Sequence, residues 1–343
     1  MENYKRLTGD LLVEFFSEEI PARMQFQSGV HLEESFKKAF DKKDIRFGEI
    51  EIFTGPRHLA IIIKQLDLKQ QDQIIEKRGP RFDANEKALN GFLNSNDICL
   101  IDTEIKDTKN GKFHFYIKKI KGLETKKIIP EIIHEIIYGF VWSKSQRWGA
   151  TELRWARPLR NILLLLNDKV VEGNLELGNG EVLKFTNYTY GHRHYDKKIK
   201  IDYISDYQKI LLQNYVILNR EDRKHKISND LKILLTKNKL SLMDDPILLE
   251  EVTGLVEFPN VMLGSISDEF MSLPPEVLST AMKVHQKYFS TTDSKNNLAP
   301  NFIFVANSLS DTKRDATVVE GNERVLKARL SDANFFWKSD LSK

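Results

Sequence analysis

Runs of apolar residues in the first part of the chain predict buried strands. Residues 11–16 (LLVEFF) form an almost continuous apolar stretch, and residues 59–66 (LAIIIKQL) form another. Continuous apolar character is typical of a strand that is covered on both faces. A turn at residues 54–57 separates the second run from a shorter strand at residues 50–53. The apolar spacing in residues 30–40 predicts a helix between the first two strands.

The strongest helical pattern lies at residues 125–140. Six isoleucines recur there at spacings of three and four residues and form one wide apolar stripe, which indicates a helix that packs on a core. Pro130 lies near the beginning of this helix, where it costs little. Other segments with apolar periodicity are also predicted to be helical: residues 86–93, 220–237, 246–251, 274–284 and 319–337.

Further segments predict hairpins and turns. Residues 113–117 alternate between phenylalanine or isoleucine and polar residues after the Asn110-Gly111 turn signal. Residues 77–83 (KRGPRFD) are expected to form a turn rich in arginine and glycine. Additional extended segments are expected at residues 161–166, 182–187, 261–263, 287–291 and 302–306.

These elements predict an α+β protein with several domains, mixed antiparallel sheets, packed helices and a closing helical segment. The polar stretch near residues 190–200 is the expected boundary. The expected division is an N-terminal α+β domain at residues 1–190, a second α+β domain at 191–318, and the start of a helical region at 319–343.

Composition changes this picture little. The 343 residues, 41% of them hydrophobic, suffice for two or three domains with real cores. The 52 basic and 49 acidic residues give a net charge of +3, which is compatible with RNA binding but more typical of a protein rich in Lys and Glu.

Cys99, the lone cysteine, excludes an intrachain disulfide, and its apolar neighbours predict a core position. Glu14 interrupts the N-terminal apolar run, and no run approaches the ~20 residues that span a bilayer. We therefore expect a cytoplasmic protein without a membrane-spanning segment.

The densest group of candidate binding residues lies at residues 143–160. It contains four arginines and two tryptophans, namely Arg147, Arg154, Arg157, Arg160, Trp148 and Trp155. Guanidinium groups pair with phosphates and indole rings stack on bases, so this pattern is typical of an RNA contact. It is equally consistent with tryptophans that anchor a core and arginines that cap helices or pair with acids.

Arg57 and the segment from His192 through Arg193 to His194 form further basic groups. The two histidines are separated by one residue, so on a strand edge they would point the same way. They have no third ligand at a usable spacing, and we expect no metal site.

Neither the Glu18-Glu19 pair nor His285 predicts a catalytic site. Carboxylates at the beginning of a helix are favoured by the macrodipole, and a histidine at the end of one is an ordinary cap. The chain has no GxxxxGK[ST] loop, no GxGxxG segment between a strand and a helix, no HIGH-like or KMSKS-like element, and no class II ATP-binding arginine motif. We therefore expect no catalytic residue, metal or bound cofactor in this chain, and no activation of an amino acid by the chain itself.

Nine blocks that follow one another along the chain form its most specific signal: FFSEEIPARM, FTGPRHLA, KRGP, SKSQRWG, RWARPLRN, YGHRHY, EEVTGLVEFPNVMLG, LPPEVLSTAMKVHQKYF and NERVLKARLSDANFF. In this order they resemble the β subunit of bacterial two-subunit glycyl-tRNA synthetase. The chain departs from that family at Phe16-Ser17, where Gly-Thr is usual, at Gln146, where methionine is usual, and at Asn161, where tryptophan is usual. The family's β subunit continues with an HD-type helical domain and an anticodon-binding domain, so this chain looks like its N-terminal half.

The resemblance implies an accessory subunit of a glycine–tRNA ligase. In that family the α subunit holds the glycine and ATP site, where ATP is used with Mg²⁺, and the β subunit binds tRNA. The implied partners are the α subunit, in an α2β2 heterotetramer, and tRNA(Gly), which the β subunit would position. The candidate RNA contacts are basic residues of the matching blocks: Arg57, Arg147, Arg154, Arg157, Arg160, His192 and Arg193.

Two other functions remain open. One is an editing-type hydrolase for mischarged tRNA, which would need a group that activates water, and only His285 or the early glutamates offer one. The other is an assembly module that binds the α subunit without touching RNA. Hydrolysis of misacylated tRNA would identify the first, and association with the α subunit without RNA binding would identify the second.

Overall fold

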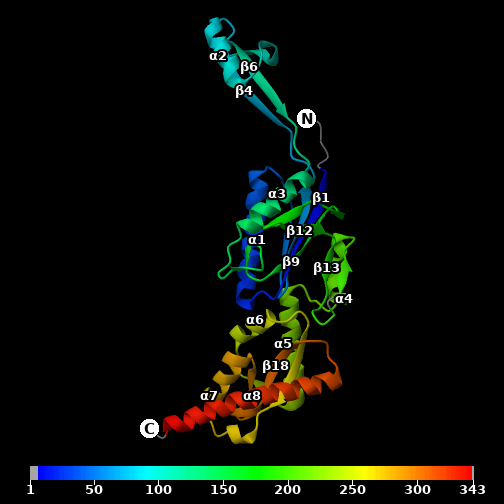
Figure 1. Cartoon of the computed structure of the whole chain (residues 1–343), viewed down its shortest axis with the longest axis vertical. Coiled ribbons are helices and arrows are strands. Elements are labelled where there is room, and N and C mark those ends of the chain that lie inside the picture. The colour runs from blue at the N-terminus through cyan, green and yellow to red at the C-terminus, as the bar shows by residue number, and fades with distance from the viewer. Residues whose placement is uncertain (1–6, 196, 342–343) are drawn as a thin grey trace.

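A seven-stranded sheet forms the centre of the computed structural model, which describes residues 7–195 and 197–341 (Figure 1). Its strand order is β11-β12-β9-β1-β3-β2, and β10 pairs with β9. The neighbours are antiparallel except for β12 and β9, which are parallel. The strands are β1 (Thr8–Ser17), β2 (Ile50–Thr54), β3 (His58–Asp67), β9 (Leu159–Leu166), β10 (Lys169–Val170), β11 (Asn174–Gly178) and β12 (Glu181–Thr186).

The two faces of this sheet belong to different cores. Leu11, Val13 and Phe15 of β1 pack with α1 and α3 on one face, whereas Leu12 packs with η2 and α4 on the other. Successive side chains of a strand point to opposite faces, so a strand covered on both sides needs apolar residues at odd and even positions alike. The covering elements are α1 (Ala22–Lys42), α3 (Thr125–Tyr138), η2 (Ile204–Asp206) and α4 (Tyr207–Gln213).

An arm projects from one end of the central sheet (Figure 1). It is a three-stranded sheet in the order β4-β6-β5 with α2 beside it. The chain leaves and re-enters the body at adjacent points, where the Gln70 amide donates to the Leu123 carbonyl at 2.9 Å. Residues 73–121 carry ten Lys and Arg against seven Asp and Glu. The elements are β4 (Gln73–Arg81), α2 (Glu86–Asn96), η1 (Leu100–Asp102), β5 (Thr103–Thr108) and β6 (Gly111–Ile120).

Two sequence-based expectations for the arm differ from the structure. Only the end of residues 77–83 forms the expected turn, because β4 continues to Arg81 by pairing with β6 through a shift in register, and the turn follows at Phe82 and Asp83. Cys99 is exposed rather than buried in a core, and so is its neighbour Ile101. The physical reason is size, because one short helix over three strands leaves even apolar side chains at the surface. In α2 no residue is buried.

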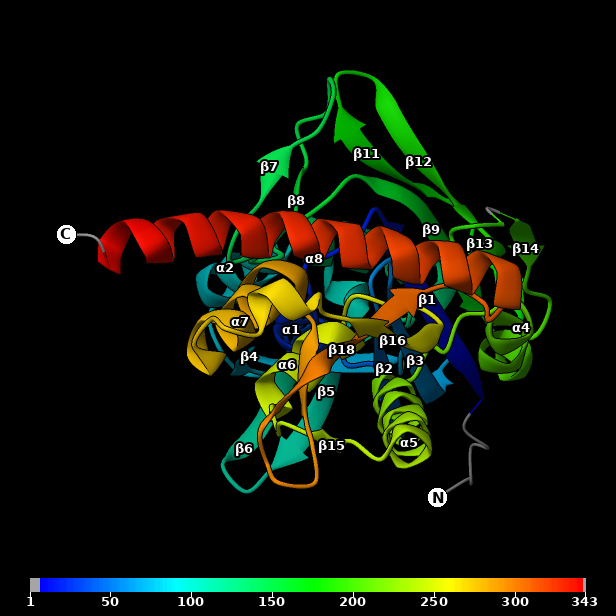
Figure 2. The same ribbon diagram turned by 90° about the horizontal axis from the view of Figure 1, so that it is seen from below.

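A second sheet, in the order β15-β17-β18-β16, follows the central one along the chain. One face packs against α5 and α6, and the other packs against α7, the π-helical turn η4 and α8. Figure 2 shows α8 running across this second unit. The strands are β15 (Ser241–Leu242), β16 (Pro259–Ser265), β17 (Phe289–Thr292) and β18 (Leu298–Asn307). The helical elements are α5 (Arg220–Asn238), α6 (Pro246–Thr253), η3 (Asp268–Phe270), α7 (Pro275–Thr280), η4 (Ala281–Gln286) and α8 (Thr312–Leu341).

Two small ribbons complete the described elements: β7 (Gln146–Arg147) with β8 (Arg154–Trp155), and β13 (Tyr188–Tyr190) with β14 (Lys198–Lys200). The predicted α+β class, with mixed and antiparallel sheets and packed helices, is confirmed. The proposed division at residues 190 and 318 stays a prediction. Among residues 7–195 and 197–341, no helix is both long and apolar enough to cross a membrane.

Candidate functional site

Several of the sequence blocks meet where the central sheet adjoins the second unit. In the loop between β1 and α1, the Glu18 amide donates to the Pro158 carbonyl at 3.0 Å. From α1, the Gln25 side chain donates to the Gly254 carbonyl at 2.6 Å, just after α6. Segments more than a hundred residues apart in sequence are therefore in direct contact. We call this region the junction and define it by five buried or half-buried polar residues: Arg57, His58, His192, Glu257 and Asn307.

Arg57 and Glu257 form a buried, bidentate ion pair in the junction. Arg57 Nε lies 2.8 Å from Glu257 Oε1, and Arg57 Nη2 lies 2.8 Å from Oε2. Arg57 Nη2 also donates to the Gly191 carbonyl at 2.6 Å. Burial alone would raise the Glu257 pKa, but the nearby His58, whose Nε2 lies 3.6 Å from Oε1, and the hydrogen bonds from Arg57 outweigh it and lower the pKa to about 2. Glu257 is therefore ionised, and it holds the turn before β3 against the segment between α6 and β16.

A second buried carboxylate, Glu14 of β1, lies beside this pair. His58 Nδ1 is 2.9 Å from Glu14 Oε2, Thr189 donates its hydroxyl to Oε1 at 2.5 Å, and Tyr207 donates its hydroxyl to Oε2. Burial opposes protonation of His58, but Glu14 and Glu257 outweigh it, so the His58 pKa is raised. Burial and then the Glu14 charge raise the Tyr207 pKa well above its ordinary value. The His58 ring and the Tyr207 hydroxyl thus both contact the Glu14 carboxyl group.

His192 is fully buried and contacts Asn307, another residue of the junction. Its Nε2 lies 2.9 Å from Asn307 Oδ1, which also accepts the amide of Glu257 at 2.8 Å. Burial lowers the His192 pKa. The predicted RNA contacts of Arg57 and His192 stay a prediction, and the structure places both residues in the interior, 4% and 0% exposed, with protein partners for their side chains.

Two of the remaining candidates are exposed but ion-paired. Arg160 lies 2.8 Å from Glu18, and Arg193 pairs with Glu19. The glutamate pair expected to begin a helix instead lies before α1, in the loop that supplies these partners. A phosphate would have to compete with the carboxylates for both arginines.

Arg147, Arg154 and Arg157 form the remaining set. Arg147 and Arg154 are exposed and stand opposite each other in the β7–β8 ribbon. Arg154 donates to the Ser145 carbonyl at 3.2 Å and Arg157 to the Ala156 carbonyl at 2.8 Å. Among the described residues, no carboxylate lies within ion-pair distance of these three guanidinium groups. The sequence therefore grouped seven residues that the structure separates into buried, ion-paired and uncompensated positions.

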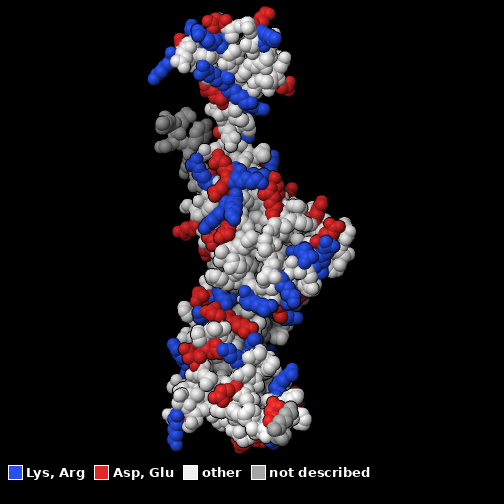
Figure 3. Space-filling model, turned by 90° about the vertical axis from the view of Figure 1, so that its left-hand side faces the viewer, with Lys and Arg blue, Asp and Glu red and all other residues white. Residues whose placement is uncertain are grey.

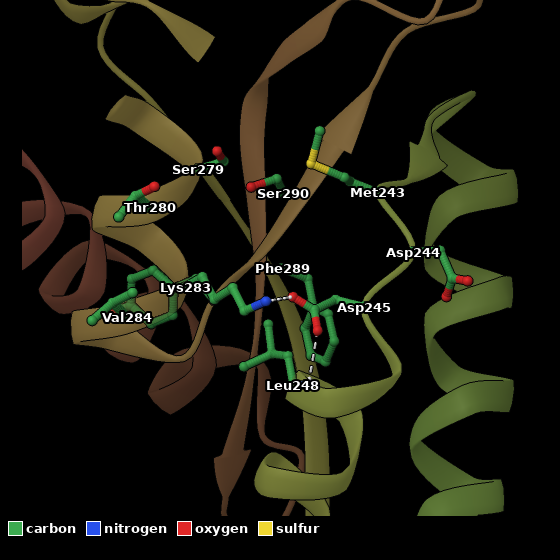
Figure 4. A pocket seen from close by; sticks show the side chains of 11 residues that line it. Met243, Asp244, Asp245, Leu248, Ser279, Thr280, Lys283, Val284, Phe289 and Ser290 are labelled. Carbon is green, nitrogen blue, oxygen red and sulfur yellow. Dashed lines mark hydrogen bonds and ion pairs between the residues drawn. The ribbon is translucent and has the colours of Figure 1, made fainter. Parts of the chain in front are cut away.

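The block LPPEVLSTAMKVHQKYF forms one wall of a cleft of about 500 Å³ (Figure 4). Ser279, Thr280 and Lys283 lie on α7 and η4, opposite Asp245 and Ser290. Lys283 Nζ is 2.5 Å from Asp245 Oδ2. Burial would raise the Asp245 pKa, but the hydrogen bond from Lys283 outweighs it and the pKa is lowered. The cleft therefore offers hydroxyls and one closed ion pair.

His285 does not line this cleft but lies in the exposed last turn of η4. Within the described part of the chain, no group of three His, Cys, Asp or Glu is placed to hold a metal ion. Side chains that sequence reasoning missed include Glu14, Tyr207 and Glu257. The single carboxylate inside the apolar run LLVEFF was the available signal, since a buried charge requires partners.

Charged side chains on the face shown in Figure 3 do not gather into one basic field. Lys and Arg alternate there with Asp and Glu along the whole length of the molecule. A uniform electrostatic attraction of nucleic acid to this face is therefore not expected, and local groups of uncompensated arginines matter more than net charge.

Comparison with known proteins identifies the family. The family described as glycyl-tRNA synthetase beta subunit matches residues 11–343. The chain is 40% identical over 335 residues to the glycine–tRNA ligase beta subunit of Rickettsia bellii (strain OSU 85-389), covering 97% of this chain and 50% of that protein. It is 39% identical over 354 residues to the corresponding subunit of Rhodospirillum centenum, covering 97% and 49%. It thus spans about half the length of the curated relatives it matches. This chain belongs to the glycyl-tRNA synthetase beta subunit family.

Proposed function

We propose that this chain acts within the β subunit of a glycine–tRNA ligase, where it binds tRNA(Gly) and positions it for ATP-dependent glycylation at the active site of an α subunit. On this proposal the ATP, with Mg²⁺, is held by the α subunit, and the two subunits form an α2β2 heterotetramer in the cytoplasm. The support is membership of the family and the arrangement of two arginines in the β7–β8 ribbon.

The observation that carries RNA binding is the cross-strand pair Arg147 and Arg154. Directly opposite residues of an antiparallel ribbon project from the same face, and like charges in such positions repel each other. The repulsion is relieved when an anion lies between or beside the two groups. Guanidinium groups suit phosphate because they can donate two parallel hydrogen bonds to it.

Phosphate contacts at this ribbon would orient RNA rather than read its sequence. Orientation has catalytic value by itself, because a substrate held in place reacts in an effectively unimolecular step. The junction supports this role mechanically. The buried Arg57–Glu257 pair ties the turn before β3 to the segment before β16, so the sheet that leads into the ribbon is fixed relative to the second unit.

The test is binding of the chain to tRNA(Gly) and to a non-cognate tRNA across a salt series. We expect affinity to fall as salt rises, with a slope of about 0.7–0.9 per neutralised phosphate. The double variant Arg147→Gln/Arg154→Gln should lower that slope by about 1.5 for both tRNAs. The matched control is Arg314→Gln/Arg329→Gln, which removes the same charge from exposed positions on α8.

An equal loss of slope in both double variants would attribute binding to net charge and overturn the role of the ribbon. No binding of either tRNA at low salt would overturn RNA positioning by this chain. In that event, association with the α subunit that persists without RNA would favour the assembly role.

A further inference from the structure

The ribbon that carries the arginine pair also borders an apolar pocket. Loop residues 148–153 fold back on the β11–β12 hairpin, where the Glu152 amide donates to the Leu177 carbonyl at 2.6 Å. Between them lies a pocket of about 320 Å³, whose walls include Trp148, Leu153, Trp155 and Pro158. This volume is at the lower end of the range for small-ligand sites.

The pocket wall is ordered before any ligand arrives. Trp148 Nε1 donates to the Trp155 carbonyl at 3.1 Å, and the Thr151 hydroxyl donates to the Trp148 carbonyl at 2.7 Å. These bonds fix the half-exposed Trp148 ring, so little side-chain entropy remains to be lost on binding. Trp155 is 1% exposed, and its buried Nε1 has no hydrogen-bond partner among the described residues.

Charge around the pocket indicates the class of occupant. Each of the three candidate arginines without a carboxylate partner is the neighbour of a pocket residue in sequence: Arg147 precedes Trp148, Arg154 precedes Trp155, and Arg157 precedes Pro158. Alternation along the ribbon places Trp155 and the Arg147–Arg154 pair on opposite faces. In a single nucleic-acid strand the bases and the phosphates likewise lie on opposite sides of the sugars.

We propose that this pocket receives one unpaired nucleobase of the bound RNA, stacked on Trp148, while the arginines contact the flanking phosphates. The inference rests on the proposed RNA-binding function and adds a subsite to it. Base–aromatic stacking tolerates every base, because every base has a π-face. The subsite therefore recognises single-stranded RNA rather than a particular sequence.

The test compares two short RNA probes of equal length and charge, one a single-stranded oligonucleotide and the other the same sugar–phosphate backbone without bases. The chain should bind the natural probe at least about 5-fold more tightly, as expected for one stacked base. Trp148→Leu, which keeps an apolar side chain, should remove that preference and leave the affinity for the abasic probe unchanged. The matched control is Trp337→Leu, because Trp337 is 37% exposed on α8 and away from the pocket.

Circular dichroism of both variants checks that they are folded, and tRNA(Gly) binding is measured in parallel. Equal affinity for the two probes, together with salt-dependent tRNA binding, would overturn the pocket and leave the proposed function standing. Loss of the preference in Trp337→Leu as well would also overturn it. No binding of tRNA or probe would overturn the proposed function itself.

Discussion

Replacing Glu257 by glutamine should destabilise the chain far more than its small change in volume suggests. The substitution keeps the size of the side chain but removes the charge that Arg57 faces at 2.8 Å. Arg57 would remain buried, with its guanidinium still charged. Removing one partner of a buried ion pair costs about 3–5 kcal/mol, because an uncompensated charge is left in the interior.

The pKa of Glu257 gives an independent magnitude. A pKa lowered from 4.5 to about 2 corresponds to roughly 3 kcal/mol of preference for the ionised form in the folded state. A carboxylate with a lowered pKa stabilises the fold above its unfolded-state pKa. This contribution is therefore complete above pH 4.5 and is lost as the pH falls toward about 2.

Urea unfolding followed by circular dichroism, at neutral pH and through the acid range, measures this effect. We expect Glu257→Gln to lose about 3–5 kcal/mol of unfolding free energy at neutral pH and to show a shallower loss in acid. The matched control is Glu18→Gln, which removes the exposed partner of Arg160 and should cost at most about 1 kcal/mol. If both variants lose the same small amount, the Arg57–Glu257 pair does not hold the two units together.

Three further perturbations test other parts of the fold. Because the pKa of His58 is raised, its protonated form stabilises the fold fully below pH 6.5 and less as the pH rises. The difference in unfolding free energy between the unmodified chain and His58→Gln should therefore shrink above that pH. Ile132→Ala, at a fully buried position of α3, should cost about 2–5 kcal/mol in urea unfolding, whereas Ile247→Ala, 74% exposed, should cost under about 0.5 kcal/mol. Replacing residues 73–120 by a short glycine linker should leave the thermal unfolding midpoint of the body unchanged, because the two ends of the arm are already bonded at Gln70 and Leu123. A lowered midpoint would show that the arm stabilises the body.

The spacing of apolar residues predicted most of the helices and strands, because that spacing decides which faces of an element can be buried. The isoleucine stripe at residues 125–140 could only be buried as one helix, and α3 (Thr125–Tyr138) buries all six isoleucines. The continuous run LLVEFF required cover on both faces of its strand, and β1 has a core on each side. By contrast, the turn expected at residues 77–83 begins only after Arg81, because pairing with β6 overrode the local signal of Gly79 and Pro80.

The binding site could be predicted only in part, because the sequence does not show which distant residue neutralises a charge. Arg57 reads like an exposed basic turn residue, but its partner Glu257 lies 200 positions later. Arg160 and Arg147 look alike in the sequence, although Glu18 pairs with one of them and no described carboxylate pairs with the other. Ion-pair partners are set by tertiary contacts, so motif reading could group these arginines but not rank them.

The blocks that resemble the family lie far apart in sequence, yet several of them share one structural purpose. FTGPRHLA supplies Arg57, EEVTGLVEFPNVMLG supplies Glu257, and YGHRHY supplies the Gly191 carbonyl that Arg57 also contacts. These residues face each other rather than the solvent. At these positions the residues that match the family therefore hold two units together more than they form a surface for RNA. A rigid joint matters to a positioning subunit, because misplacing a substrate by about 1 Å can cost about 100-fold in rate. On the proposed function, the buried ion pair fixes the position of the ribbon, and the exposed arginines of the ribbon bind RNA. A weakened joint should therefore reduce the rate of glycylation more than it reduces the affinity for RNA.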